Sequence, residues 1–126
     1  MDLDEALVYV VDDDEAVRDS LTMLLRAVGL NGRPFESAPE FLENYDAEQH
    51  GCVFADIRMP GMSSLDLQNE LNSRNAPIPL IFITGHGDVP MAVDAMKAGA
   101  LDFIEKPFRD QELLDRVHQA LAEDKE

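Results

Sequence analysis

The chain has 126 residues, of which 45% are hydrophobic, and these values indicate one globular domain with a single hydrophobic core. Its formal net charge of -16 excludes direct contact with nucleic acid, because such contact depends on lysine and arginine side chains that neutralise phosphates. The acidic N-terminus and its short apolar run exclude a secretory signal and a membrane span, so we expect a cytoplasmic protein with no membrane partner.

Taken in chain order, the apolar patterns predict five strands that alternate with five helices. Short unbroken apolar runs, rich in β-branched and aromatic residues, indicate strands with both faces covered, and apolar residues three or four positions apart indicate helices. The predicted elements are a strand at 7–11, a helix at 17–28, a strand at 31–35, a short helix from 37, a strand at 52–55, a helix through 67–71, a strand at 80–84, a helix at 89–96, a strand at 101–105 and a helix at 113–121.

Local signals support this division of the chain. Gly29 follows the first helix as a C-terminal stop, and Ser37 with Glu40 has the spacing of a capping box at the start of the second. Pro34 suits only an edge strand, because proline cannot donate a ladder hydrogen bond. The only cysteine, Cys52, lies in a predicted strand and excludes an intramolecular disulfide, which favours a reducing compartment.

This alternation of strands and helices predicts an α/β fold. Right-handed crossovers between parallel strands restrict it to a doubly wound sheet with helices on both faces. Neither a linker nor an internal repeat divides the sequence, so residues 1–126 are expected to form one domain.

Polar side chains stand where the predicted strands end. Asp12 and Asp13 follow the first strand, Asp56 follows the third, Thr84 ends the fourth, and Lys106 follows the fifth. Ligands bind at the carboxyl ends of the strands in such sheets, and neighbouring strands lie about 4.8 Å apart. We therefore expect these five side chains to form one cluster.

Taken singly, several of these polar residues have purely structural explanations. Asp14 fits a helix N-cap, Thr84 a backbone hydrogen bond at a strand end, and Lys106 a surface charge. Asp56 fits neither a cap nor a solvated helix face, because it stands directly between a buried run and the segment IRMPG. The coincidence of all these groups at one sheet edge favours a functional site.

Three carboxylates in one cluster indicate a divalent cation. Asp12, Asp13 and Asp56 would repel one another unless a cation with hard oxygen ligands were bound, and Mg²⁺ commonly takes one or two carboxylates together with phosphate oxygens. A carboxylate can also act as the nucleophile in phosphoryl transfer, for which Lys106 and Thr84 would supply a positive charge and a hydroxyl donor. The segment DDDEAVRDS lacks the alternating ligand spacing and the central glycine of an EF-hand, which disfavours that type of calcium site.

Three segments of the chain resemble the receiver domain of two-component response regulators. They are VVDDDEAVR, ADIRMPGMS and FITGHGDVPMAVDAMKAGALDFIEKPF, and the last resembles the FixJ-type subfamily. The likeness extends from Leu7 to Leu121. It implies a five-stranded (βα)5 flavodoxin-like, or CheY-like, fold with strand order 2-1-3-4-5.

The resemblance also implies roles for the clustered residues. Asp56 would accept the phosphoryl group. Asp12, Asp13 and Asp56, together with the backbone carbonyl of Arg58, would bind Mg²⁺, with Asp13 as a more direct ligand than Asp12. Lys106 would contact the phosphate. The implied chemistry is limited to the domain's own phosphoryl transfer and dephosphorylation.

Other features of the family concern the switch and the neighbouring loops. The resemblance implies that Thr84 and Phe103 form a coupled switch pair, and that the Lys106–Pro107 peptide bond is cis. The chain departs from the family at Ser64, where glycine is usual. Serine can cap the following helix, so the fold and chemistry are expected to survive, and the departure bears on the path of the 57–64 loop.

The resemblance implies partners as well. A sensor histidine kinase would supply the phosphoryl group, and phosphorylation would favour a homodimer. DNA would be reached through a C-terminal effector domain absent from this chain, either a helix-turn-helix or an ATPase-type module, and a stand-alone receiver is a further alternative. The sequence names neither the kinase nor the target genes.

Two other classes of function compete with a phosphorylation switch. A Mg²⁺-dependent aspartyl-phosphate hydrolase would use similar residues on external phosphomonoesters, but it needs a substrate pocket or cap that a chain of 126 residues has little length to build. A pure interaction module would leave the acidic cluster and Lys106 unexplained.

Overall fold

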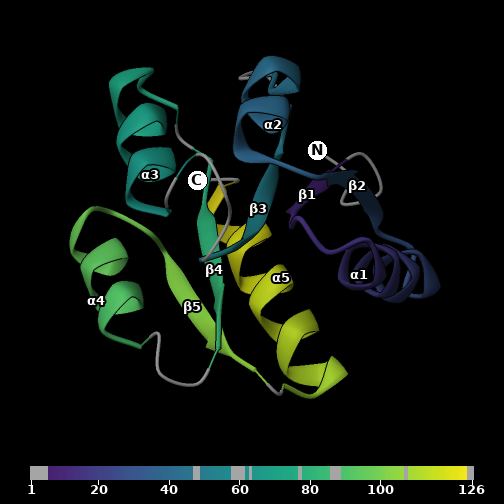
Figure 1. Cartoon of the computed structure of the whole chain (residues 1–126). Coiled ribbons are helices and arrows are strands. Elements are labelled where there is room, and N and C mark those ends of the chain that lie inside the picture. Colours follow the sequence, from purple (N-terminus) through teal and green to yellow (C-terminus); the bar gives the residue numbers. More distant parts are fainter. Residues whose placement is uncertain are drawn as a thin grey trace.

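Ten elements alternate along the chain in the order that the sequence predicts (Figure 1). The computed structural model describes residues 6–46, 49–57, 62, 64–76, 78–85, 89–106 and 108–124. The strands are β1 (Leu7–Val11), β2 (Asn31–Phe35), β3 (Gly51–Asp56), β4 (Leu80–Thr84) and β5 (Asp102–Glu105). The helices are α1 (Glu15–Ala27), α2 (Ala38–Asn44), α3 (Ser64–Ser73), α4 (Val89–Lys97) and α5 (Asp110–Asp124).

The five strands form one parallel sheet in the order β2-β1-β3-β4-β5, which confirms the doubly wound, CheY-like arrangement. The order of the strands reverses next to β1, because the chain first adds β2 on one side and then crosses to β3 on the other. A crevice for ligands is typical at such a reversal, beyond the carboxyl ends of the strands. Pro34 lies on β2, which is an edge strand as predicted.

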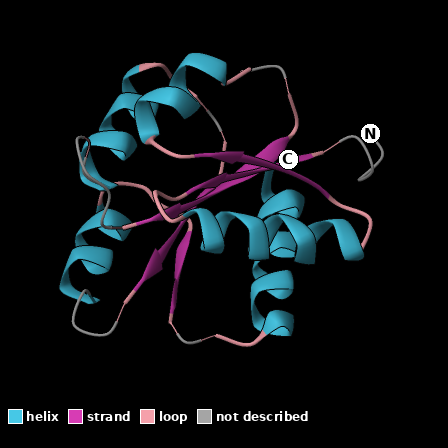
Figure 2. Ribbon diagram, turned by 45° about the vertical axis from the view of Figure 1, so that its right-hand side comes forward, coloured by secondary structure: helices cyan, strands magenta, loops and turns pink. Residues whose placement is uncertain are grey.

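Helices cover both faces of the sheet, as Figure 2 shows. On one face, α1 and α5 pack against alternate strand residues in a core that includes Val8, Val10, Leu21, Leu25, Cys52, Phe54, Ile81, Ile83, Ile104, Leu113, Val117 and Leu121. On the other face, α2, α3 and α4 pack in a core that includes Tyr9, Val11, Phe35, Phe41, Val53, Ala55, Leu67, Leu71, Phe82, Ala92 and Ala95. The parallel strands are therefore buried on both sides, which explains their unbroken apolar runs.

The predicted helix signals are present in the structure. Asp14 is the N-cap of α1 and accepts a hydrogen bond from the Ala16 amide, and Ser37 accepts one from the Glu40 amide at the start of α2. Gly29 has a φ of +82°, a conformation that glycine adopts readily, and it follows the end of α1. None of the described helices is long and apolar enough to cross a membrane.

Candidate functional site

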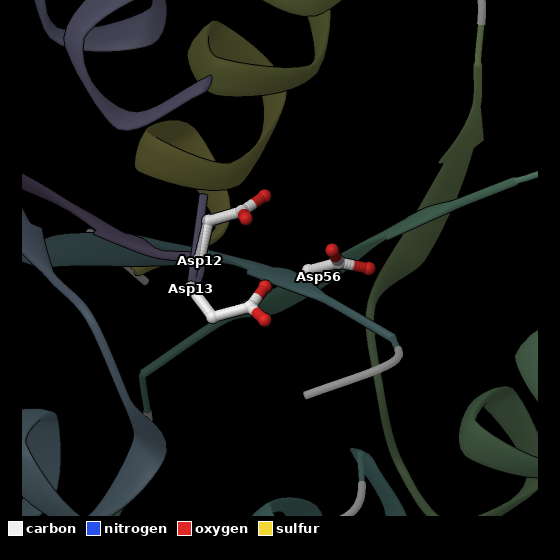
Figure 3. Close-up of side chains that lie close together, drawn as sticks. All are labelled: Asp12, Asp13 and Asp56. Atoms are coloured by element: carbon white, nitrogen blue, oxygen red, sulfur yellow. The ribbon is translucent and has the colours of Figure 1, made fainter. Parts of the chain in front are cut away.

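Three carboxyl groups meet at the carboxyl-end edge of the sheet. Val11 of β1 pairs with Ala55 of β3, so the next residues, Asp12 and Asp56, stand opposite each other where the two strands end. Asp12, Asp13 and Asp56 each offer a carboxylate oxygen within 4.8 Å of the others, and Figure 3 shows the three groups side by side. The predicted clustering of these carboxylates is present in the structure.

The ends of β4 and β5 bring two further groups to this edge. The Lys106 amide donates a hydrogen bond of 2.8 Å to the carbonyl of Thr84, which ties the two strand ends together. The Lys106 ammonium lies 3.9 Å from Oδ2 of Asp56, and the Lys106 side chain remains 38% exposed. A partly exposed ammonium beside the carboxylate can therefore contact an incoming anionic group.

Asp12 is the most buried of the three carboxylates, with an exposed fraction of 1%. Its Oδ1 accepts a hydrogen bond of 2.9 Å from the Asp14 amide, whereas Oδ2 is buried and has no hydrogen-bond partner among the residues that the structure describes. Burial raises the pKa of Asp12 above its usual value, and the charges of Asp56 and Asp13 raise it further against the opposing effects of the Asp14 amide and Lys106. When Asp12 is ionised, its Oδ2 atom therefore lacks a hydrogen-bond partner among the described residues.

The excess of negative charge in this cluster fits a divalent cation. Three carboxylates carry three negative charges when ionised and Lys106 supplies one positive charge, so these four groups together carry a net charge of -2. Hard oxygen ligands around a buried, unpartnered Oδ2 atom are the donor set that Mg²⁺ prefers. The residues present therefore fit Mg²⁺.

Thr84 and Phe103 lie on the same face of the sheet. Phe82 pairs with Phe103, and side chains alternate along a strand, so Thr84 points to the side of Phe82 and Phe103. Thr84 is fully buried, and its hydroxyl donates a long hydrogen bond of 3.3 Å to the carbonyl of Gly85. Phe103 is partly buried against the core beneath α2, α3 and α4. The two residues are thus diagonal neighbours on one face.

Two features of the site were not found from the sequence. Arg18 of α1 donates a hydrogen bond of 2.7 Å from Nη1 to the carbonyl of Asp12.

An open groove of about 670 Å³ lies between α1 and the start of α5, next to Lys106. Its apolar lining includes Val17, Leu21, Met23, Leu24 and Phe108. Met23 is 70% exposed, which is unusual for a large apolar side chain on the surface of a helix.

Three expectations fall on residues that lie outside the described part of the chain. The carbonyl of Arg58 and the Lys106–Pro107 peptide bond belong to such residues. Ser64 begins α3, but the path of the loop before it, through 58–61 and 63, is likewise not described. These three expectations remain predictions.

Comparison with known proteins gives a family match over most of the chain. Residues 8–118 match the model of the response regulator receiver domain. Nodulation protein W of Bradyrhizobium diazoefficiens is 54% identical over 121 residues, which cover 96% of this chain and 53% of the relative.

Solved structures agree with this match. A structure of the response regulator StyR has a TM-score of 0.90 at 50% identity, over 96% of this chain and 61% of that one. Full-length FixJ from B. japonicum has a TM-score of 0.91 at 42% identity, over 96% of this chain and 60% of that one. The chain spans about half the length of the curated relatives it matches.

Proposed function

Because the chain belongs to the receiver domain family of two-component response regulators, with FixJ-type relatives, we propose that it is a signalling switch that Asp56 turns on by accepting a phosphoryl group. Membership in this family implies a cognate histidine kinase as partner. The observation that carries the proposal is the meeting of three carboxylates and Lys106 at one sheet edge. A cytoplasmic location accords with such a partner.

The proposed reaction moves one phosphoryl group between two side chains. An oxygen of the Asp56 carboxylate forms a bond to phosphorus as the bond from phosphorus to the kinase histidine breaks, and the electron pair of that bond returns to the imidazole nitrogen. Phosphoryl transfer depends mainly on positioning and on neutralising the charge of the equatorial oxygens. Lys106, whose ammonium already lies 3.9 Å from Asp56, supplies one such contact, and Thr84 supplies a hydroxyl donor.

Asp12, Asp13 and Asp56, with the carbonyl of Arg58, would hold Mg²⁺. When bound, the metal would neutralise charge on the carboxylates and on the phosphoryl oxygens. Asp12 contributes through its unpartnered Oδ2 atom and Asp13 through an exposed carboxylate.

The kinase would dock close to Lys106. The groove between α1 and the start of α5 has an apolar lining and opens beside this lysine, so a protein seated there lies next to Asp56. Exposed Met23 at the rim would offer such a partner an adaptable apolar contact.

The signal from Asp56 would pass to the face of the sheet that lies opposite α1 and α5. Phosphate on Asp56 would attract the Thr84 hydroxyl, whose present hydrogen bond is long, and the partly buried Phe103 ring would turn into the space that Thr84 leaves. This rearrangement would alter the surface of α4 and β5, where Val93 is already 41% exposed. We propose that this surface becomes the dimer contact. An effector domain beyond this chain, of the helix-turn-helix or ATPase type, would then reach DNA.

Intact-mass spectrometry after incubation with acetyl phosphate and Mg²⁺ tests the proposal. Wild-type protein should gain one phosphoryl group, and Asp56→Asn should gain none, because an amide is a poor nucleophile toward phosphorus. Asp19→Asn, the same chemical change at an exposed position of α1, is the matched control and should label like wild type. Equal labelling of wild type and Asp56→Asn would exclude Asp56 as the acceptor.

The same samples distinguish the proposed switch from the competing hydrolase. A switch consumes acetyl phosphate only through its own aspartyl-phosphate and should release no steady phosphate from small phosphomonoesters such as p-nitrophenyl phosphate. Sustained release that depends on Asp56 would favour a hydrolase instead.

A further inference from the structure

The segment that carries Asp12 and Asp13 needs a restraint on its backbone. Three carboxylates lie within 4.8 Å of one another, and their mutual repulsion favours conformations in which the segment after β1 moves away from Asp56. A site that binds a cation tightly must hold these groups in place before the cation arrives, because ordering them on binding would weaken the affinity.

Several hydrogen bonds hold the two ends of this segment, at Asp12 and at Asp14. The Asp12 amide donates to the carbonyl of Phe35 at 3.1 Å, which extends the pairing of β1 with β2. The Asp14 amide donates to Oδ1 of Asp12, and the Asp14 side chain caps α1. The bond from the Asp14 amide closes a turn around the peptide group between Asp12 and Asp13, but none of these bonds is made by that peptide group itself.

Arg18 holds that peptide group. Its Nη1 atom donates a hydrogen bond of 2.7 Å to the carbonyl of Asp12, six residues earlier in the chain. This carbonyl belongs to the planar peptide that joins Asp12 to Asp13, so its orientation fixes the Cα atom from which the carboxylate of Asp13 extends. A hydrogen bond from a charged donor is roughly twice as strong as a neutral one.

The arginine binds the backbone and leaves the carboxylate oxygens open. Within the described chain, Oδ2 of Asp12 has no hydrogen-bond partner, although the Arg18 guanidinium contacts the carbonyl of the same residue. A guanidinium paired with a carboxylate would instead compete with a cation for that oxygen. The contact with the carbonyl therefore restrains the segment without occupying the cation's ligands.

We propose that Arg18 is a positioning residue for the cation site, which it preorganises by fixing the peptide between Asp12 and Asp13. This inference rests on the proposed metal-dependent function. It predicts that removing the positive charge of Arg18 weakens Mg²⁺ binding, the opposite of what charge alone would do. Loss of a positive charge near a cation site should strengthen cation binding by Coulomb's law, whereas loss of a positioning contact should weaken it. The direction of the change therefore separates the two effects.

The test is a calorimetric Mg²⁺ titration at fixed ionic strength on four variants. Arg18→Met keeps the length of the side chain and removes the donor, and it should weaken Mg²⁺ binding by about 10-fold or more, the usual cost of losing a contact that orients a metal ligand. Arg18→Lys keeps the charge but loses the planar fork, and its affinity should lie between those of Arg18→Met and wild type.

Two controls complete the series. Arg26→Met removes the same charge at the exposed last turn of α1, about 12 Å further along the helix, and should leave the affinity unchanged or slightly increased. Asp13→Ala should remove most of the binding. If Asp13→Ala binds Mg²⁺ as wild type does, the proposed metal site itself is wrong, whatever the role of Arg18.

A result that overturns the inference is Mg²⁺ binding by Arg18→Met that is as tight as in wild type, or tighter. A urea-unfolding curve without Mg²⁺ checks that each variant folds. If Arg18→Met does not fold, Arg18→Lys decides alone. Mg²⁺ binding by Arg18→Lys that is at least about threefold weaker than in wild type supports the inference. This threshold is lower than the full effect expected for loss of a positioning contact. Wild-type affinity refutes the inference.

Discussion

Helices α5 and α4, which lie on opposite faces of the sheet, are held by different kinds of side chain. The buried side chains of α5 are mostly large: Leu113, Leu114, Val117, Ala120 and Leu121. Among the described side chains of α4, the buried ones are Ala92 and Ala95, flanked by the partly buried Met91 and Met96. Leucine buries more apolar area than alanine, and methionine adapts easily to a changed surface.

This difference assigns separate tasks to the two faces. The face beneath α1 and α5 has a core of large aliphatic side chains. On the other face, the buried side chains of α4 are small, and Thr84 and Phe103 lie on that side of the sheet, so we expect the region beneath α4 to rearrange at smaller cost in free energy. The proposed switch would need both properties, because its site must stay preorganised while its output surface changes.

The largest effect is expected for core substitutions that compare the two helices directly. Leu113→Ala should lower the free energy of unfolding by about 3 kcal/mol, because it leaves a cavity in a tightly packed face. Met96→Ala, which shortens a partly buried side chain of α4, should lower it by about 1 kcal/mol. Urea unfolding without Mg²⁺ measures both. Equal losses would show that α4 is held as firmly as α5.

A smaller effect is expected at the link between the site and α4. Thr84→Ala should accept the phosphoryl group but dimerise at least about tenfold more weakly, a change of about 1.4 kcal/mol. Thr84→Ser keeps the hydroxyl and is the matched control. Light scattering on fully phosphorylated samples measures the dimer. If Thr84→Ala dimerises like wild type, Thr84 does not carry the signal, and if wild type stays monomeric, dimerisation is not the output.

The smallest effect concerns the pH dependence of the free energy of unfolding, through Asp12 at the carboxyl-end edge of the sheet. Burial raises the pKa of Asp12 above the ordinary value of 3.8. The folded protein then binds more protons than the unfolded chain between these two pKa values, so the contribution of Asp12 to stability is full below 3.8 and is lost as pH rises through the raised value.

Asp12→Asn should therefore gain stability relative to wild type as pH rises from 3.8 through the raised pKa, and the gain should level off above it. Urea unfolding of both proteins without Mg²⁺, over this pH range, measures the difference. A difference that stays constant with pH would show that Asp12 has no raised pKa in the folded protein.

The sequence was sufficient to predict the fold and the clustered site residues for a simple reason. Each of Asp12, Asp56 and Thr84 stands directly at the end of an apolar run, and parallel strands bring such ends to one edge. The contact of Arg18 could not be predicted in this way, because it joins a helix side chain to a backbone carbonyl, and an arginine on a helix surface usually indicates a solvated face. The predicted elements therefore located the carboxylates and missed the group that restrains them.

The shared face of Thr84 and Phe103 also needed the structure. Which side chains face α4 depends on the register between β4 and β5, and a shift of one residue would turn Phe103 to the other face. Apolar runs without alternation contain no such information, because both faces of these strands are buried.

Amide hydrogen exchange on wild type and Asp56→Asn, both treated with acetyl phosphate and Mg²⁺, tests the central claim most directly. The claim is that phosphorylation of Asp56 changes the face beneath α4 and leaves the face beneath α1 and α5 as it is. Exchange should change in α4 and in β4–β5 of wild type alone, with α1 and α5 unaffected. Identical exchange in the two proteins, or a change confined to α1 and α5, would contradict the claim.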